Sequence, residues 1–165
     1  MQLLISDANI LIDMEEGLLI DPMFKLPYQF TIPDILFVEE LETKHEYLLG
    51  LGLSQSELAG ETMAYAMELI PRYKNASRND CFALALAAQE ECTLLTGDKA
   101  LRNAAEMEAV LVRGTLWLVS LMVRQGLIKI GEAREAYERM KESGRRLPWS
   151  VVDAELNELE NQGFS

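Results

Sequence analysis

Two patterns of apolar residues alternate along the chain. Short runs without polar alternation are typical of strands buried on both faces of a sheet, and the first is residues 3–5. Apolar residues at helical spacing follow at once, at Ile10, Leu11, Ile12 and Met14. The chain therefore opens with a predicted buried strand that turns directly into a helix.

The same alternation continues to the end of the chain. Further strands are predicted at residues 31–32, 92–95 and 109–112, and a turn with a short strand at 49–53. Helices are predicted at residues 35–47, 56–73, 80–91, 99–107, 115–125, 130–143 and 149–161. We interpret residues 26–30, which contain Pro27, as a connector. Strands that alternate with helices predict an α/β fold: an α/β/α sandwich around a central parallel sheet, with extra helices at the C-terminal end.

A chain of 165 residues most simply forms one domain. We expect residues 1–125 to form the α/β domain that carries the function. Residues 126–165 are expected to be a helical extension of the same domain, because no Ser/Gly-rich linker separates them.

Composition and charge narrow the classes of function. The hydrophobic fraction of 49% with 25% charged residues is that of a globular protein, and the longest apolar stretch, residues 115–123, is far shorter than the roughly 20 residues that span a membrane. We expect no membrane association and a cytoplasmic location. The formal charge of −12 disfavours broad binding to polyanions but permits a divalent cation or a basic protein partner.

The chain has few residues for other common chemistries. His45 is the only histidine, which excludes a multi-histidine zinc site and disfavours Ser-His-Asp or Cys-His catalysis. Cys81 and Cys92 lack CxxC spacing, so we interpret them as buried thiols. Any catalysis must therefore depend on carboxylates.

Four acidic residues are the candidates: Asp7, Glu40, Asp80 and Asp98. Each also has a structural explanation, since the three aspartates can cap helices and Glu40 can be one solvated charge among several. However, Asp7 and Asp98 both follow an apolar strand and precede a helix. In a parallel sheet such strand ends lie at one edge, where ligands bind.

Four carboxylates in one cleft would repel each other and their pKa values would rise unless a cation joined them. Carboxylate oxygens suit Mg²⁺ or Mn²⁺, which often share their coordination with a phosphate. Asn9 and Thr96 lie near the candidates and could orient them. The pattern therefore favours metal-dependent attack on a phosphate ester.

The same residues resemble motifs of the PIN-domain family (PilT N-terminus), which includes the toxins of prokaryotic VapBC toxin–antitoxin pairs. The matching segments, over roughly residues 1–125, are ISDANIL at 5–11, VEEL at 38–41, Asn79-Asp80 before an Ala/Leu-rich helix, and LLTGD at 94–98. The helices after residue 126 extend beyond the compact toxin pattern.

The resemblance implies a Rossmann-like fold and an endoribonuclease that uses Mg²⁺ or Mn²⁺ to hydrolyse RNA phosphodiesters, commonly as a dimer. Asp7, Glu40, Asp80 and Asp98 would be both the catalytic and the metal-binding residues, with Glu39 as an alternative to Glu40. Asn9 and Thr96 match the accompanying polar residues. The resemblance also implies an antitoxin protein as partner.

Basic residues precede the third acidic candidate. Arg72, Lys74 and Arg78 are candidates for contacts to the RNA backbone, and a solvated loop is an equal explanation of their position.

Two other functions fit part of the pattern. One is a catalytically silent PIN-like module that binds proteins, with residues such as Trp117 and Trp149 as a surface. The other is a haloacid-dehalogenase-like phosphatase, but its DxDxT motif would need a second Asp where this chain has Asn9.

Overall fold

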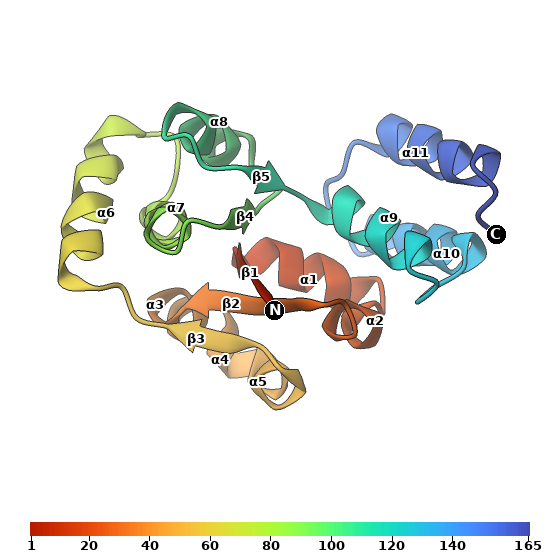
Figure 1. Cartoon of the computed structure of the whole chain (residues 1–165), viewed down its shortest axis with the longest axis horizontal. Coiled ribbons are helices and arrows are strands. Elements are labelled where there is room, and N and C mark those ends of the chain that lie inside the picture. The colour runs from red at the N-terminus through yellow and green to blue at the C-terminus, as the bar shows by residue number, and fades with distance from the viewer. The chain divides into compact units, whose positions relative to one another are not determined.

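The computed structural model describes residues 1–165 and contains one sheet of five parallel strands. The strands are β1 (Gln2–Ser6), β2 (Tyr28–Pro33), β3 (Ser54–Ser56), β4 (Thr93–Leu95) and β5 (Val112–Arg113). Their order in the sheet is β3-β2-β1-β4-β5, with β1 between β2 and β4 (Figure 1). The predicted α/β/α fold with a central parallel sheet is confirmed.

This strand order places a switch of direction at the centre of the sheet. The chain moves outward from β1 to β2 and β3, and then returns to the other side of β1 to form β4 and β5. At such a switch point the connections leave two neighbouring strands in opposite directions and open a crevice at their carboxyl ends. The residues that follow β1 and β4 therefore lie at the position where α/β sheets bind ligands.

The chain divides into two compact units. The first contains Met1–Ile10 and Pro27–Arg113, and the second contains Leu11–Leu26 and Gly114–Ser165. The division between residues 1–125 and 126–165 remains a prediction about which part carries the function. No helix combines the length and the apolar composition needed to cross a membrane.

The first unit holds the sheet and most of the helices between its strands. These helices are α3 (Asp34–Leu36), the π-helical turn η1 (Phe37–Leu41), α4 (Glu42–His45), α5 (Tyr47–Leu51), α6 (Gly60–Arg72), α7 (Arg78–Gln89) and α8 (Lys99–Met107). Helix α7 packs on β1, β2 and β4 and lies against α6 and α8. Every side chain from Cys81 to Ala87 is buried, as the CFALALAA run predicts, and each buried Leu contributes about 1.5–3 kcal/mol.

The second unit is helical. It contains α2 (Ile20–Phe24), α9 (Thr115–Arg124), α10 (Ile130–Glu142) and α11 (Trp149–Asn161), and α1 (Ala8–Glu16) has residues in both units. The buried carboxylate of Asp13 accepts hydrogen bonds from Thr115 Oγ1 at 2.7 Å and from Arg145 Nε at 2.6 Å. Trp149 packs edge-on against Tyr137.

Several element boundaries differ from the predicted ones. The connector predicted at residues 26–30 is wrong over Tyr28–Phe30, which belong to β2. Pro33 ends that strand at its last residue, so proline removes no hydrogen bond from its centre. The helix predicted at 35–47 is broken by η1, which adds a residue to one turn, and Val38 in this turn is 57% exposed.

Glu108 joins the end of α8 to the end of α6. Its carboxylate accepts hydrogen bonds from Tyr65 Oη at 2.6 Å, from Tyr73 Oη, and from Arg72 Nη1 at 3.0 Å. Hydrogen bonds from Tyr65 and Tyr73, and the Arg72 guanidinium, hold the pKa of Glu108 below its ordinary value. The segment after α6 is thereby fixed against α8.

We predict that Glu108→Gln lowers the free energy of unfolding by about 1 kcal/mol at neutral pH, because the charged acceptor is lost. A carboxyl whose pKa is lowered by folding stabilises the protein fully above its ordinary pKa, and this contribution disappears as pH falls through the lowered value. The difference between wild type and variant should therefore shrink below about pH 4.

Urea denaturation at several pH values measures this difference. Glu106→Gln, at an exposed position of the same helix, is the matched control. An equal difference at every pH would show that the Glu108 charge does not contribute.

Candidate active site

Asp7 lies buried where β1 ends, with 3% of its surface exposed. Its backbone N–H donates to Leu95 O at 3.0 Å, which continues the pairing of β1 with β4 beyond Ser6. Its Oδ1 accepts from Ile10 N at 3.0 Å, and its Oδ2 accepts from Thr96 Oγ1 at 2.5 Å. The carboxylate therefore caps the first turn of α1 and also contacts the neighbouring strand end.

Thr96 joins the ends of the two central strands. It is fully buried, and its hydroxyl donates to Asp7 Oδ2 and accepts from the backbone N–H of Asp98 at 3.1 Å. Asp98 is exposed and caps α8, since its Oδ2 accepts from Leu101 N at 2.8 Å. The hydroxyl thus connects Asp7 to Asp98 across the switch point of the sheet.

Asp80 enters from the first turn of α7. It forms a capping box with Ser77: Ser77 Oγ accepts from Asp80 N, and Asp80 Oδ2 accepts from Ser77 N, each at 3.0 Å. Burial raises the pKa of Asp80, and the negative charge of Asp98 raises it further. The two carboxylates are therefore electrostatic neighbours, although no residue links them directly.

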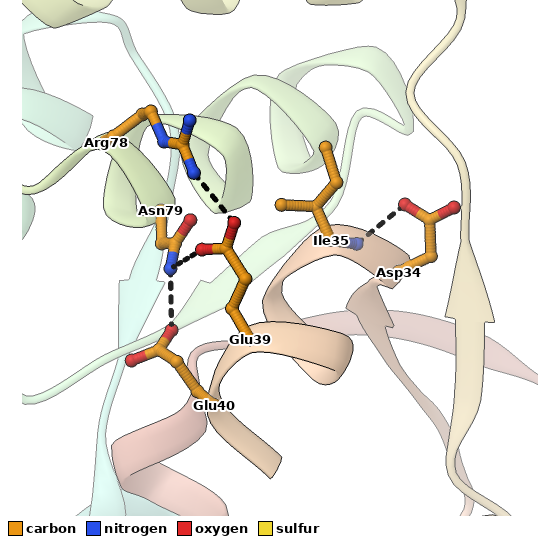
Figure 2. A network of polar contacts seen from close by, with 6 residues as sticks. All are labelled: Asp34, Ile35, Glu39, Glu40, Arg78 and Asn79. Carbon is orange, nitrogen blue, oxygen red and sulfur yellow. Dashed lines mark hydrogen bonds and ion pairs between the residues drawn. The ribbon is translucent and has the colours of Figure 1, made fainter. Parts of the chain in front are cut away.

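Glu39 and Glu40 project from η1 toward the start of α7 (Figure 2). Arg78 Nη2 donates to Glu39 Oε1 at 2.7 Å, and Asn79 Nδ2 donates both to Glu39 Oε2 at 2.9 Å and to Glu40 Oε2 at 3.3 Å. One amide group therefore holds two adjacent carboxylates.

The two glutamates differ in their electrostatic environment. Hydrogen bonds from Asn79 and the Arg78 charge lower the pKa of Glu39. The pKa of Glu40 is raised, chiefly by burial and also by the charges of Asp80 and Glu39. Glu39 thus faces a cation of the protein, whereas Glu40 faces another carboxylate.

Asn79 is a site residue to which the sequence analysis assigned no role. Its Oδ1 is buried without a hydrogen-bond partner, a cost that the two bonds of its Nδ2 to charged acceptors offset. A sequence signal existed, because Asn79 directly precedes Asp80 at a helix start. Nothing in the sequence, however, pairs it with residues 39 and 40.

The other predicted site residues differ in their exposure and ion pairing. Asn9 is exposed on the first turn of α1. Arg78 is ion-paired with Glu39 and its guanidinium lies 5.5 Å from the centroid of the Phe82 ring. Arg72 is ion-paired with Glu108, whereas Lys74 is exposed and forms no ion pair.

Carboxylate oxygens are suitable ligands for a divalent cation, but these side chains do not form a complete coordination sphere. No group of three or more His, Cys, Asp or Glu side chains converges closely enough to hold a metal ion. Each of Glu40, Asp80 and Asp98 uses only one of its two oxygens in the hydrogen bonds above. The pKa values of Glu40 and Asp80 are raised chiefly by burial and further by neighbouring carboxylates. Oxygen ligands with excess negative charge suit Mg²⁺ or Mn²⁺ once the side chains turn toward a shared position.

A cavity of about 550 Å³ lies away from these residues, at the amino ends of β1 and β4. Glu90, Glu91 and Glu108 line it without any basic residue. It therefore does not suit a phosphate-bearing ligand.

Comparison with known proteins agrees with this fold. No curated protein is similar enough in sequence to match the chain. Among solved structures, a chain of VapBC2 from Rickettsia felis bound to a DNA fragment from their promoter superposes with a TM-score of 0.50 and 13% identity, over 68% of this chain and 98% of that one. At this identity the likeness shows the fold alone.

A family model covers nearly the whole sequence. The model of DUF3368, described as a PIN domain, matches residues 3–161 and so includes all four acidic candidates and the helices α10 and α11. The resemblance noted from the sequence motifs is confirmed. The chain belongs to the PIN-domain family DUF3368.

Proposed function

We propose that this chain is a divalent-metal-dependent endoribonuclease whose catalytic and metal-binding residues are Asp7, Glu40, Asp80 and Asp98. The observation that carries the proposal is the Thr96 hydroxyl, which joins Asp7 to the segment of Asp98 at the switch point of the sheet. Membership of the PIN-domain family supports a nuclease, and the cluster of oxygen ligands supports a Mg²⁺ or Mn²⁺ ion.

In this proposal Asp7 has a different role from Asp80 and Asp98. Asp7 is held on two sides and provides the fixed ligand, while Asp98 and Asp80 sit at helix starts and turn their second oxygens toward the shared position. A bound Mg²⁺ or Mn²⁺ would neutralise charge on a phosphoryl oxygen and lower the pKa of water. The protein would hold the scissile phosphate in line with that water and keep Asp7 in place through Thr96.

Glu40 is favoured over Glu39 as the fourth ligand. Glu39 is already neutralised by Arg78 and Asn79, so its charge is not available to a cation. Glu40 is close enough to Asp80 for their charges to interact, and a cation between them would remove that repulsion. In this arrangement Asn79 and Glu39 position Glu40.

RNA is the substrate favoured by the family and by the local distribution of charge. Lys74 is available for a phosphate contact, and the exposed Arg78 can contact a phosphate through guanidinium N–H groups that it does not use for Glu39. Asn9, on the first turn of α1, is proposed to orient Asp7 or a bound water. The overall charge of −12 disfavours such contacts over the surface as a whole.

A protein partner is the second part of the proposal. One structural neighbour, VapBC2, was solved bound to a DNA fragment from its promoter, and the family that the sequence motifs resemble includes toxins that pair with antitoxins. Val38, Tyr47 and Leu51, which lie between the start of η1 and the end of α5, are exposed large hydrophobic side chains and are candidates for contact with an antitoxin. The acidic surface suits a basic antitoxin.

We predict that the purified chain cleaves RNA with Mg²⁺ or Mn²⁺ and not with EDTA, and that Asp7→Asn lowers the rate by about 100-fold or more. Loss of a group that merely supports a metal ligand already costs roughly 10- to 100-fold. Cleavage of labelled single-stranded and structured RNA measures the rate. Asp153→Asn, at an exposed position of α11, is the control and should cleave like wild type.

Circular dichroism and the melting temperature check that Asp7→Asn remains folded. Wild-type cleavage in EDTA, or full activity of folded Asp7→Asn, would contradict the mechanism. No cleavage and no saturable Mn²⁺ binding by calorimetry would favour the silent protein-binding module.

We also predict that Glu40→Gln and Glu39→Gln differ. Glu40→Gln removes a proposed ligand and should weaken Mn²⁺ binding by about 10-fold or more, whereas Glu39→Gln keeps a hydrogen-bond acceptor for Asn79 and should weaken it less. Isothermal titration with Mn²⁺ on both variants measures the affinities. A larger loss in Glu39→Gln would reverse the assignment.

A further inference from the structure

A second cavity is lined by two segments that lead along the chain to the proposed active site. It has a volume of about 220 Å³ and is formed by residues 72–76 on one side and by α8 on the other. The α8 wall consists of Ala100, Asn103, Ala104 and Met107, which recur at positions i, i+3, i+4 and i+7 and so share one face of the helix. The opposite wall is anchored, because Glu108 binds both Arg72 and Tyr73.

The lining combines an apolar floor with a polar and basic rim. Alanines leave room for a flat group, and Tyr73 and Met107 provide aromatic and thioether surface. Lys74 and Arg72, whose guanidinium is ion-paired with Glu108, are the basic residues of the lining, and no carboxylate lines this cavity. The cavity near β1 and β4, by contrast, is lined by three glutamates, and a third, about 200 Å³ in volume, is lined by Asp34 and Glu39.

Two amide side chains face this cavity without a partner in the protein. Neither Asn75 nor Asn103 takes part in a side-chain hydrogen bond, and both are exposed. An amide offers a donor and an acceptor together, which is the pattern on the edge of a nucleobase. Lys and Arg beside it suit the phosphate that accompanies the base.

Both walls of the cavity lead to the acidic residues. Residues 72–76 continue into α7, which begins two residues before Asp80, and α8 begins directly after Asp98. Asn103 is five residues beyond Asp98, which is about 7.5 Å along the helix axis. A nucleotide adjacent to a phosphate held by a cation at Asp80 and Asp98 would therefore be within reach of the cavity.

We propose that this cavity binds the unpaired base of a nucleotide adjacent to the scissile phosphate, with Asn103 and Asn75 at the base edge and Lys74 at the flanking phosphate. This inference rests on the proposed nuclease function and adds a preference for single-stranded RNA, since a base must be unstacked and unpaired to enter. Base contacts made equally before and during cleavage affect KM more than kcat.

The test measures RNA binding without cleavage. Fluorescence anisotropy in EDTA gives the Kd for a short labelled single-stranded oligoribonucleotide, for its duplex, and for an abasic oligomer of equal length. Asn103→Ala removes the amide, and Ala100→Leu narrows the cavity with a residue that also favours helix. Asn161→Ala and Lys25→Ala, at exposed positions elsewhere, are the matched controls.

We expect Asn103→Ala and Ala100→Leu each to raise the Kd for the single strand about tenfold, in line with the loss of one base contact, and to leave the abasic Kd nearly unchanged. Lys74→Ala should weaken binding of both oligomers and lower the salt-dependence slope by about 1. With Mn²⁺ present, the first two variants should raise KM with little change in kcat.

Unchanged binding by folded Asn103→Ala and Ala100→Leu would overturn the inference, as would an equal loss for the abasic oligomer or tighter binding of the duplex. Failure of wild type to bind RNA would also overturn it. Base-dependent binding without cleavage would contradict the nuclease activity but support the cavity assignment. Cleavage without base-dependent binding would support the nuclease activity but contradict the cavity assignment.

Discussion

The buried carboxylate of Asp7 is the constraint on which the site depends. A buried charge is tolerated only when hydrogen bonds satisfy it, and here the partners come from the first turn of α1 and from Thr96 beyond β4. The Thr96 hydroxyl reaches Asp7 because β4 is the parallel neighbour of β1 at the switch of the sheet. The strand order therefore places the Thr96 hydroxyl against the Asp7 carboxylate, and the same hydroxyl binds the backbone N–H of Asp98.

Asp80 and Glu40 lie in electrostatically unfavourable environments, which is common at functional sites. Burial raises the pKa values of Asp80 and Glu40, and negative charges nearby add to this: Asp98 for Asp80, and Asp80 and Glu39 for Glu40. The capping box at Ser77 and the Asn79 amide hold them there despite this cost. Perturbed carboxylates of this kind are consistent with the proposed cation-binding function.

The parallel sheet and the ends of β1 and β4 were predictable from sequence, because short apolar runs followed by Asp7 and by Thr96-Gly97-Asp98 carry a local signal. Strand β2 was only partly predicted, since Pro27 obscured its start. The pairing of Asn79 with Glu39 and Glu40 could not be predicted. It depends on the π-helical turn, whose extra residue changes which side chains face α7, and on contact between segments about forty residues apart.

The most direct test of a shared cation is anomalous diffraction from crystals of the chain soaked in Mn²⁺. We expect one or two Mn²⁺ peaks bounded by carboxylate oxygens of Asp7, Asp80 and Asp98, at about 2.0–2.3 Å from them. Glu40 should lie beside the same position, directly or through water. Absence of a peak there at saturating Mn²⁺, or a peak only at acidic residues elsewhere on the surface, would contradict the proposal that these residues share one ion.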